Sequence, residues 1–349
     1  PAIVGHTRLA VLDPSPAGDQ PMRSPCGRKL LVYNGELYNE PELRRELEAQ
    51  GVIFTGHCDA ETVLHALDRW GRAALDRFRG MFALAWVDLE AGSLVLARDP
   101  LGVKPLYWWS DGREVAFASE VPALLRHPGV RLEPDLQAVS AYLTTIRPTV
   151  GDRTLFAGVR TLEPGQVLSF DLDASSLHPT ASTLWQGPTG LIDEAEADEL
   201  VRTAIEDSVA RHLRSDVPVC MLLSGGLDST IIAAIVAELR AHGGSGPANT
   251  YCAGLLDGET ASPDFGFARS VAQELGLTHT EVAIDRAMFQ RRWPEMVQRL
   301  GVPLSTPNEV AIHEVARRLR HQGHVVALSG EGADELFAGY ELPTRRLFE

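Results

Sequence analysis

The stretch VCMLLSGGLDSTIIAAIV, from Val219 to Val236, places two glycines, an acid and two hydroxyl residues between two apolar runs. This pattern predicts a strand, a tight turn and a helix. Glycine allows unusual backbone angles and the close approach of a ligand, and the free N–H groups at the start of a helix attract anions. In sheets of parallel strands, ligands bind beyond the carboxyl ends of the strands. The turn is therefore a candidate anion site.

Asp228 would be out of place beside a bare anion, so its presence favours a Mg²⁺ ion between the acid and bound phosphates. The P-loop pattern GxxxxGK[ST] does not fit, because no lysine stands before Ser229. The alternative interpretation is a plain glycine turn followed by a serine-capped helix. A second stretch, VVALSGEGADELFAGYE over Val325–Glu341, weakens that alternative, because a strand again runs into glycines and acids. Its own alternative is a solvated acidic loop that caps a helix.

Strands and helices alternate along the second half of the chain. We expect strands at 217–223, 249–255, 279–284 and 324–328, and helices at 193–213, 229–241, 264–275, 286–300 and 308–322. The alternation predicts an α/β doubly wound fold, a parallel sheet with helices on both faces. The helix over 229–241 is apolar nearly all round, so we expect it to be buried.

The first half is rich in short apolar or alternating runs bounded by Gly, Asp or Pro, which predicts an α+β domain. Two helices interrupt these strands, one before Gly51 and one before Gly71. Ser, Thr, Pro and Gly then dominate a stretch that predicts a linker. The expected organisation is a first domain over residues 1–175, a linker over 176–190 and a second domain over 191–349.

The bulk composition limits the kinds of partner. The net charge of -15 argues against nucleic acid and anionic membranes as main partners. No run approaches the roughly 20 apolar residues of a membrane helix. None of the four cysteines forms a CxxC pair, so a zinc or redox motif is not supported, and such sparse cysteine fits a reducing cytoplasm.

The two glycine stretches resemble known ATP-site motifs. LSGGLDST resembles the pyrophosphate loop of the N-type ATP pyrophosphatases, which split ATP into AMP and pyrophosphate to activate a carboxyl or carbonyl oxygen. SGEGADE resembles the second ATP-site motif of glutamine-dependent asparagine synthetases, a family that includes β-lactam synthetase-like relatives. The resemblance implies ATP and Mg²⁺ as ligands, with Asp228 and Asp334 at the metal and Glu331 in a catalytic role. The ATP-binding residues that it implies are Leu223, Ser224, Gly225, Gly226, Asp228, Ser229, Ala253, Ser329, Gly330 and Asp334.

Five stretches of the first half resemble the class-II glutamine amidotransferase domain, in the same order. They are GHTRLAVLD (Gly5–Asp13), YNGELYN (Tyr33–Asn39), TGHCDAETVLHAL (Thr55–Leu67), FRGMFALAWVD (Phe78–Asp88) and ARDPLGVKPLYW (Ala97–Trp108). The resemblance implies an N-terminal-nucleophile fold, a four-layer αββα sandwich, whose nucleophile is a cysteine at the mature N-terminus.

The resemblance also implies roles for single residues in binding glutamine. Arg8 would clamp the α-carboxylate, because a planar guanidinium makes two parallel bonds. Asn34 and Gly35 would form the catalytic oxyanion hole, and Glu36 and Asp59 would bind the α-amino group. Each residue has a simpler interpretation: a surface charge for Arg8, a type I′ hairpin turn for YNGE, and a helix N-cap for Asp59.

The sequence departs from the family pattern at both ends. It opens at Pro1, close to GHTRL, and none of its four cysteines can replace an N-terminal one. We therefore expect a fragment that lacks glutaminase activity as given, or else a truncated or degenerate natural protein. The lysine that the family places near the adenylate cannot be assigned in this sequence.

Together the two resemblances predict a carbon–nitrogen ligase that uses glutamine, aspartate and ATP. Glutamine hydrolysis would supply ammonia to a β-aspartyl-adenylate, giving asparagine, AMP, pyrophosphate and glutamate in the cytoplasm. Two alternatives stay open: a related ligase that acts on another carboxylate, and a non-catalytic paralogue that binds nucleotide or glutamine. Arg299–Arg317 corresponds to the acceptor region of the relatives, and its specificity is not readable. A homodimer is possible by analogy with the family.

Overall fold

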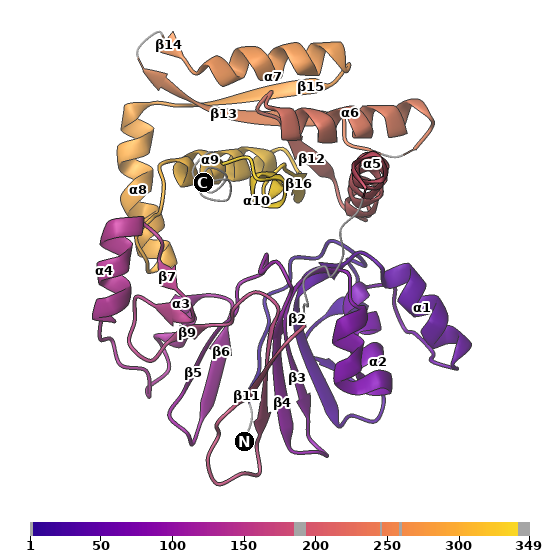
Figure 1. The fold of residues 1–349 in the computed structure, drawn as a ribbon, viewed down its shortest axis with the longest axis vertical. Coiled ribbons are helices and arrows are strands. Elements are labelled where there is room, and N and C mark those ends of the chain that lie inside the picture. Colours follow the sequence, from indigo (N-terminus) through magenta and orange to yellow (C-terminus); the bar gives the residue numbers. More distant parts are fainter. Residues whose placement is uncertain (1–2, 185–192, 245, 258–259, 341–349) are drawn as a thin grey trace. The chain divides into compact units, whose positions relative to one another are not determined.

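The computed structural model describes residues 3–184, 193–244, 246–257 and 260–340 (Figure 1). The chain divides into two compact units. Unit 1 comprises Pro1–Leu191 and Met296–Thr306, and unit 2 comprises Ile192–Glu295 and Pro307–Glu349. No helix within the described ranges is long and apolar enough to cross a membrane.

Unit 1 contains two antiparallel sheets. The six-stranded sheet has the order β1 (Met22–Arg23), β2 (Lys29–Leu37), β3 (Gly80–Asp88), β4 (Ser93–Arg98), β10 (Gln166–Asp171) and β11 (Thr180–Thr183). The five-stranded sheet has the order β6 (Val115–Ala118), β5 (Tyr107–Ser110), β9 (Arg160–Thr161), β8 (Arg153–Thr154) and β7 (Thr149–Val150). The helical segments are η1 (Pro16–Gly18), α1 (Glu40–Ala49), α2 (Asp59–Trp70), η2 (Gly71–Arg77), α3 (Val121–Leu124) and α4 (Leu136–Thr145).

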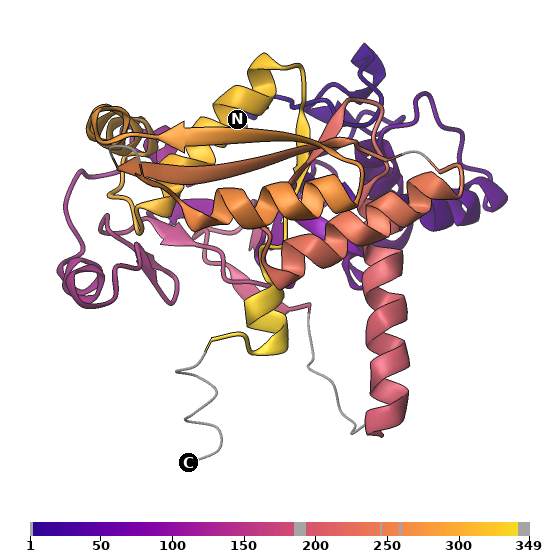
Figure 2. The same cartoon turned by 90° about the horizontal axis from the view of Figure 1, so that it is seen from above.

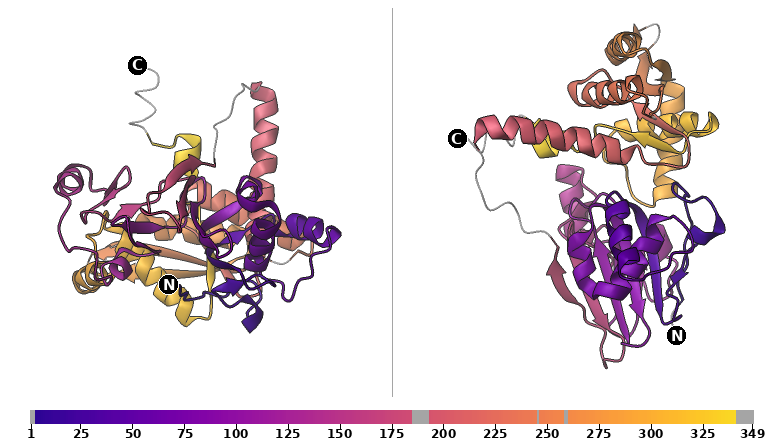
Figure 3. Two further views of the ribbon diagram at one scale, coloured as in Figure 1. Left: turned by 90° about the horizontal axis from the view of Figure 1, so that it is seen from below. Right: turned by 90° about the vertical axis from the view of Figure 1, so that its right-hand side faces the viewer.

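Alternating side chains on the strands place these elements in four layers. On β3, Phe82 and Leu84 belong to the core beneath α1 and α2, whereas Ala83 belongs to the core shared with the second sheet. On β5, Trp108 packs toward the first sheet, and Trp109 packs against the core beneath α3. The order is therefore helices, sheet, sheet, helix, and the predicted αββα sandwich is confirmed. Figure 3 (right) shows α1 and α2 in front of the six-stranded sheet.

Part of the predicted linker belongs to unit 1. Thr180–Thr183 forms strand β11 and pairs antiparallel with β10, where Ser169 lies opposite Thr180. The linker prediction is wrong for these residues, because hydroxyl-rich residues are tolerated on an exposed edge strand, and all four are exposed. Residues 185–190 of the predicted linker lie outside the described residues.

Unit 2 is built on a parallel sheet in the order β15 (Thr278–Ile284), β13 (Asn249–Asp257), β12 (Val219–Leu222) and β16 (Val326–Leu328). The short strand β14 (Thr260–Ala261) pairs antiparallel with β13. The helices are α5 (Glu194–His212), α6 (Leu227–Ala241), α7 (Pro263–Glu274), α8 (Arg286–Leu300), α9 (Asn308–His321) and α10 (Ala333–Phe337). Helix α8 runs from unit 2 into unit 1. The predicted strands and helices of this half are all present, within a few residues.

Helices cover both faces of this sheet. Met221 of β12 packs into a core with α6 and α7, and these two helices lie on one side of β13 and β15 (Figure 2). The neighbouring Cys220 packs on the opposite face with Val315 of α9. Successive residues of a strand point to opposite faces, so the doubly wound prediction is confirmed.

The expected burial of the helix over 229–241 is wrong. Helix α6 buries only Ser229, Ala233 and Val236, while Leu227 is 75% exposed and Ile231 is 37% exposed. One stripe of the helix lies on the sheet, while Leu227 and Ile231 remain exposed to solvent. Apolar composition on all sides therefore did not imply burial on all sides.

Candidate active site

The turn between β12 and α6 is closed by hydrogen bonds among its own hydroxyl groups. The hydroxyls of Ser224 and Ser229 lie 3.1 Å apart, and the Gly226 N–H donates to Ser224 Oγ at 3.3 Å. The Ser229 hydroxyl also donates to the Gly226 carbonyl at 3.2 Å. Before the turn, the buried Leu223 donates its N–H to the carbonyl of Tyr251 on β13 at 2.8 Å. These bonds shape the turn while Ser224 and Gly226 stay exposed.

Gly225 is required by both its conformation and its surroundings. Its φ of 79° lies in the left-handed region that favours glycine. A Cβ at this position would also lie 2.5 Å from Phe267 Cβ and 2.7 Å from Ala268 N on α7. Gly226 differs, because it has a φ of -72° as the N-cap of α6 and a Cβ there would lie 3.3 Å from Ser224 Oγ. Gly225 therefore lets the turn pack closely against α7, whereas Gly226 has free space beside it.

The second glycine loop adjoins the first. β16 lies beside β12, with Leu328 opposite Met221, so both strands end at the same edge of the sheet. A Cβ on Gly330 would lie 2.9 Å from the Cβ of Asp228 and 3.3 Å from Ser229 N. The two stretches predicted to bind ATP are therefore in direct contact at the start of α6.

Carboxylates stand at the start of the helices that follow these loops. Asp228 is in the first turn of α6, Asp334 is in the first turn of α10, and Glu331 donates its N–H to Ser329 Oγ at 3.4 Å. Among the described residues, no group of three or more His, Cys, Asp or Glu could hold a metal ion. A nucleotide-bound Mg²⁺ needs only one or two protein carboxylates, because phosphates and water complete its shell. The donors present thus fit Mg²⁺ carried by a nucleotide.

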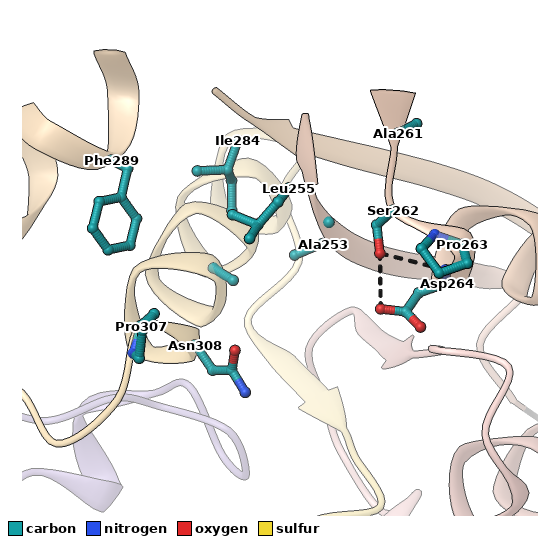
Figure 4. A pocket seen from close by; sticks show the side chains of 12 residues that line it. Ala253, Leu255, Ala261, Ser262, Pro263, Asp264, Ile284, Phe289, Pro307 and Asn308 are labelled. Atoms are coloured by element: carbon teal, nitrogen blue, oxygen red, sulfur yellow. Dashed lines mark hydrogen bonds between the residues drawn. The ribbon is translucent and has the colours of Figure 1, made fainter. Parts of the chain in front are cut away.

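A cavity of about 400 Å³ lies in unit 2 at the carboxyl ends of β13 and β15 (Figure 4). Its lining residues are Ala253, Gly254, Leu255, Ala261, Ser262, Pro263, Asp264, Ile284, Phe289, Pro307, Asn308 and Ala311. None of them is a lysine or arginine. Ser262 and Asp264 supply a hydrogen-bonded polar edge at 3.0 Å, opposite the apolar side chains of Leu255, Ile284 and Phe289. The cavity therefore suits a flat, weakly polar group better than a carboxylate.

The cavity joins two stretches that the sequence analysis kept apart. Ala253, predicted to contact the nucleotide, lines it together with Pro307 and Asn308 of the predicted acceptor region. The earlier part of that region belongs to unit 1, where the Leu304 carbonyl accepts from Tyr142 Oη at 2.9 Å. The acceptor region is thus divided between the two units.

In unit 1, the YNGE residues lie in the interior of a strand. Asn34 and Gly35 pair with Ala83 and Phe82 of β3, so the hairpin-turn interpretation is wrong. A Cβ on Gly35 would collide with the carbonyl of Met81 and lie 2.9 Å from Phe82 Cα. Gly35 is therefore needed because the backbone of β3 passes directly over it.

Asp59 bonds to the residues that flank the strand segment 34–36. Its Oδ2 accepts the Leu37 N–H at 2.9 Å and the Tyr33 hydroxyl at 3.2 Å. Asp59 is the first residue of α2 and makes no side-chain cap, since the N-cap is Cys58. The carboxylate is 7% exposed, and this burial raises its pKa to about 6, despite the opposing hydrogen bonds from Leu37 and Tyr33. The structure thus holds Asp59 against the two residues on either side of Asn34, Gly35 and Glu36.

The guanidinium of Arg8 bonds to its own loop. It donates to the carbonyls of Leu12, Asp13 and Ser15, and Nη1 lies 3.6 Å from the carboxylate of Asp19. Its side chain is 16% exposed, so the interpretation as a plain surface charge does not hold. The loop connects onward to α2, because Asp13 Oδ2 accepts the His57 N–H at 2.8 Å. Arg8 is built into the structure near the start of α2.

Two carboxylates that the sequence analysis did not single out hold this region. Glu61 accepts the N–H groups of Thr55 at 2.7 Å and Gly56 at 2.9 Å. Asp99 accepts four backbone N–H groups and is 1% exposed. The signal for Asp99 was the sequence Asp-Pro-Leu-Gly, since Asp before such residues favours bonding to its own following backbone.

Comparison with known proteins assigns both units. Residues 1–180 match the family model described as a glutamine amidotransferase domain, and residues 200–349 match the one described as asparagine synthase. The chain is 33% identical to a Bacillus subtilis protein named "Asparagine synthetase [glutamine-hydrolyzing] 3", covering 97% of this chain and 56% of that protein. It is 36% identical to a Mycobacterium bovis protein named "Putative asparagine synthetase [glutamine-hydrolyzing]", covering 97% and 52% respectively. The chain thus spans about half the length of these relatives.

A solved glutamine phosphoribosylpyrophosphate amidotransferase from B. subtilis is also similar, at 16% identity and a TM-score of 0.38, covering 92% of this chain and 80% of that one. This likeness is too remote to add to the assignment, which the two family models and the relatives carry. Both units are matched, in the expected order and over nearly the whole chain. The chain therefore belongs to the family of glutamine-hydrolysing asparagine synthetases, in which a glutamine amidotransferase domain precedes an asparagine synthase domain.

Proposed function

We propose that this protein is an ATP-dependent carbon–nitrogen ligase that makes asparagine from aspartate, with nitrogen taken from glutamine. The observation that carries the proposal is the contact of Gly330 with Asp228 and Ser229, which joins two glycine loops at one sheet edge. A single anion turn would suit many ligands. Two such loops, each followed by a carboxylate, suit the splitting of ATP between its α- and β-phosphates.

In unit 2 the chemistry is the activation of a carboxylate, which is a poor acceptor for an amine until it is adenylated. The hydroxyls of Ser224 and Ser229 and the N–H groups that begin α6 bind and orient the phosphates. Asp228 and Asp334 would hold Mg²⁺, which when bound supplies charge neutralisation at the departing pyrophosphate. Glu331 takes up a proton as ammonia attacks. Ala253 places the adenine in the apolar cavity, whose weakly polar lining fits a base.

In unit 1 the chemistry is the release of ammonia from glutamine. The attacking group would be an N-terminal cysteine thiol of the full-length protein, which this sequence does not contain, and water would then free glutamate from the thioester. The Asn34 amide and the Gly35 N–H bind the oxyanion that forms on the glutamine side-chain carbonyl. Glu36 and Asp59 bind the α-ammonium group, and Arg8 binds the α-carboxylate in exchange for bonds to its own loop. Because the pKa of Asp59 is about 6, this carboxylate carries its charge at neutral pH.

The identity of the acceptor is tested by product analysis with the full-length protein. Aspartate is supplied as the sole acceptor, with ATP, Mg²⁺ and either glutamine or ammonium chloride, and pyrophosphate, AMP and asparagine are measured together. Equal amounts of all three support the proposal. Pyrophosphate release only with a different carboxylate would show a related ligase instead. Tight nucleotide or glutamine binding without turnover of any acceptor would show a non-catalytic paralogue.

The cellular location and the oligomeric state are proposed from the family and the chemistry. The use of ATP and glutamine, with four unpaired cysteines, supports a place in the cytoplasm. A homodimer is proposed by family analogy, and sedimentation at several protein concentrations tests it: a single monomeric species throughout would contradict it.

A further inference from the structure

The deeply buried carboxylate of Asp99 organises the loop that follows β4. Its Oδ1 accepts the N–H groups of Leu101 at 3.1 Å and Val103 at 3.0 Å, and its Oδ2 accepts that of Lys104 at 3.0 Å. Its fourth bond is different, because Oδ2 reaches across to the Phe82 N–H on strand β3 at 3.2 Å. One side chain thus ties a loop to a strand in a place closed to solvent.

The strand residue held by Asp99 is the one opposite Gly35. The Asp99 N–H also donates to the Phe82 carbonyl at 2.7 Å, so Asp99 binds both backbone groups of Phe82. Phe82 pairs with Gly35, and its Cα lies 2.9 Å from where a Cβ on Gly35 would stand. Any shift of β3 at this point is therefore passed directly to the Gly35 backbone.

Arg98 closes the same loop from the other side. Its Nε donates to the Lys104 carbonyl at 2.7 Å, and Nη2 and Nη1 donate to the carbonyls of Gly102 and Leu162, each at 2.6 Å. Adjacent side chains of opposite charge thus bind N–H groups and carbonyls of one short loop, and each also bonds outside it, Asp99 to Phe82 and Arg98 to Leu162. Such a clamp has little freedom, because charged hydrogen bonds inside a protein are strong.

We propose that Asp99 and Arg98 are positioning residues for glutamine hydrolysis, an inference that rests on the function proposed above. Asp99 fixes the β3 backbone at Phe82, which fixes the Gly35 N–H and the neighbouring Asn34 amide where the oxyanion forms. Neither charged side chain needs to touch glutamine. Their effect is on the rate of the chemical step, since donors of an oxyanion hole act through their exact placement before the reaction.

The test compares two nitrogen sources in the full-length protein. Asp99→Asn keeps the side-chain size, but turns an NH₂ group toward backbone N–H groups that need an acceptor. We expect kcat for glutamine hydrolysis to fall about a hundredfold, the loss typical of an active-site misplacement near 1 Å. The KM for glutamine should change little, because Arg8, Glu36 and Asp59 still bind the amino acid. The rate of asparagine formation with ammonium chloride should stay unchanged.

A matched control lies at the other end of the same hairpin. Asp88 accepts the N–H groups of Glu90 and Ala91, each at 3.0 Å, in the β3–β4 turn. Asp88→Asn perturbs the same two strands with the same chemistry, and it should leave both rates intact. An unchanged glutamine kcat in folded Asp99→Asn, or an equal loss in Asp88→Asn, would overturn the proposal.

If Asp99→Asn unfolds and loses both rates, Arg98→Lys decides the question. It keeps the positive charge but cannot reach all three carbonyls, and the bonds that it changes go to Lys104, Gly102 and Leu162 rather than to Phe82. A lower kcat with glutamine at an unchanged ammonia-supported rate supports the positioning role, and no change rejects it. If the unsubstituted protein forms no amide from ammonia, the proposed function itself fails, which is a separate result.

Discussion

Gly35 in unit 1 and Gly225 in unit 2 are both irreplaceable by geometry, yet for different reasons. Gly35 has ordinary strand backbone angles and is forced by the β3 backbone that crosses it. Gly225 has a φ of 79° and is also forced by α7 packed against it. The first case is only a problem of space. The second adds a backbone conformation that a side chain disfavours.

The side chains around the two glycines also differ. Around Gly35, buried carboxylates bind backbone N–H groups, as Asp59 and Asp99 do. Around Gly225, the hydroxyls of the exposed Ser224 and the buried Ser229 bind one another and the turn. The proposed glutamine site is thus held in place by buried carboxylates that accept backbone N–H groups. The proposed nucleotide site instead leaves the Ser224 hydroxyl exposed, where a bound phosphate would replace its bond to Ser229.

The largest effect is expected for Gly225→Ala. Left-handed backbone costs a side chain about 1 to 2 kcal/mol, and overpacking against Phe267 adds roughly 1 to 3 kcal/mol. Thermal or urea unfolding should show the lost stability, and aspartate-dependent pyrophosphate release should fall to background. Gly226→Ala is the matched control, because its φ is ordinary and the nearest atom is 3.3 Å away. Equal stability of the two variants would contradict this account of the turn.

A smaller and more selective effect is expected for Gly35→Ala. Overpacking against Met81 and Phe82 costs about 1 to 3 kcal/mol, with no added backbone strain. Glutamine-supported synthesis should be lost, while ammonia-supported synthesis continues at its former rate. Loss of both activities in a variant whose unit 2 remains folded would show that the two sites are not separable as described.

The charge of Asp59 should control glutamine binding. Asp59→Asn removes the charge that pairs with the α-ammonium group, so KM for glutamine should rise at least about tenfold, as for a lost charged hydrogen bond. In the unsubstituted protein, KM should rise as the pH falls below about 6, where Asp59 becomes protonated. A KM that stays constant from pH 8 to pH 5 would contradict the assigned role.

Unlike glutamine binding, the folding stability of Asp59→Asn should not be weakened at pH 8. Burial raises the pKa of Asp59 in the folded state, so its contribution to stability is present below about pH 4 and is lost as the pH rises through about 6. An amide oxygen still accepts the Leu37 N–H. The free energy of unfolding at pH 8 should therefore not fall in this variant, and a clear loss measured by urea unfolding would refute the reading.

An effect on stability alone, with no change in activity, is expected for Glu61→Gln. Burial would raise the pKa of Glu61, but hydrogen bonds from His65, Thr55 and Gly56 outweigh it and set the pKa at about 2. Its contribution to stability is therefore present above about pH 4.5 and is lost as the pH falls toward 2. The variant should lose about 1 to 2 kcal/mol at pH 7, because an amide NH₂ would face the Gly56 N–H. A similar loss at pH 2.5 would contradict this.

The sequence predicted most of the elements, because these depend on local patterns. Strand–turn–helix signals predicted the turn that holds Gly225 and Asp228, and the alternation of strands and helices predicted the parallel sheet. The contact of Gly330 with Asp228 joins residues about a hundred positions apart, and only the β12–β16 pairing shows it. Asp99 was missed for the same reason, since its bond to Phe82 crosses between strands. The exposure of Leu227 depends on which elements cover α6, which composition does not reveal.

The central claim is that the joined loops activate a carboxylate by adenylation. The most direct measurement uses aspartate carrying a heavy-oxygen label in its side-chain carboxylate, with ATP, Mg²⁺ and ammonia, in the full-length protein. Mass spectrometry of the nucleotide product should find one labelled oxygen in AMP, because the carboxylate oxygen stays on the phosphorus when ammonia displaces AMP. Unlabelled AMP, or ADP as the nucleotide product, would contradict the account.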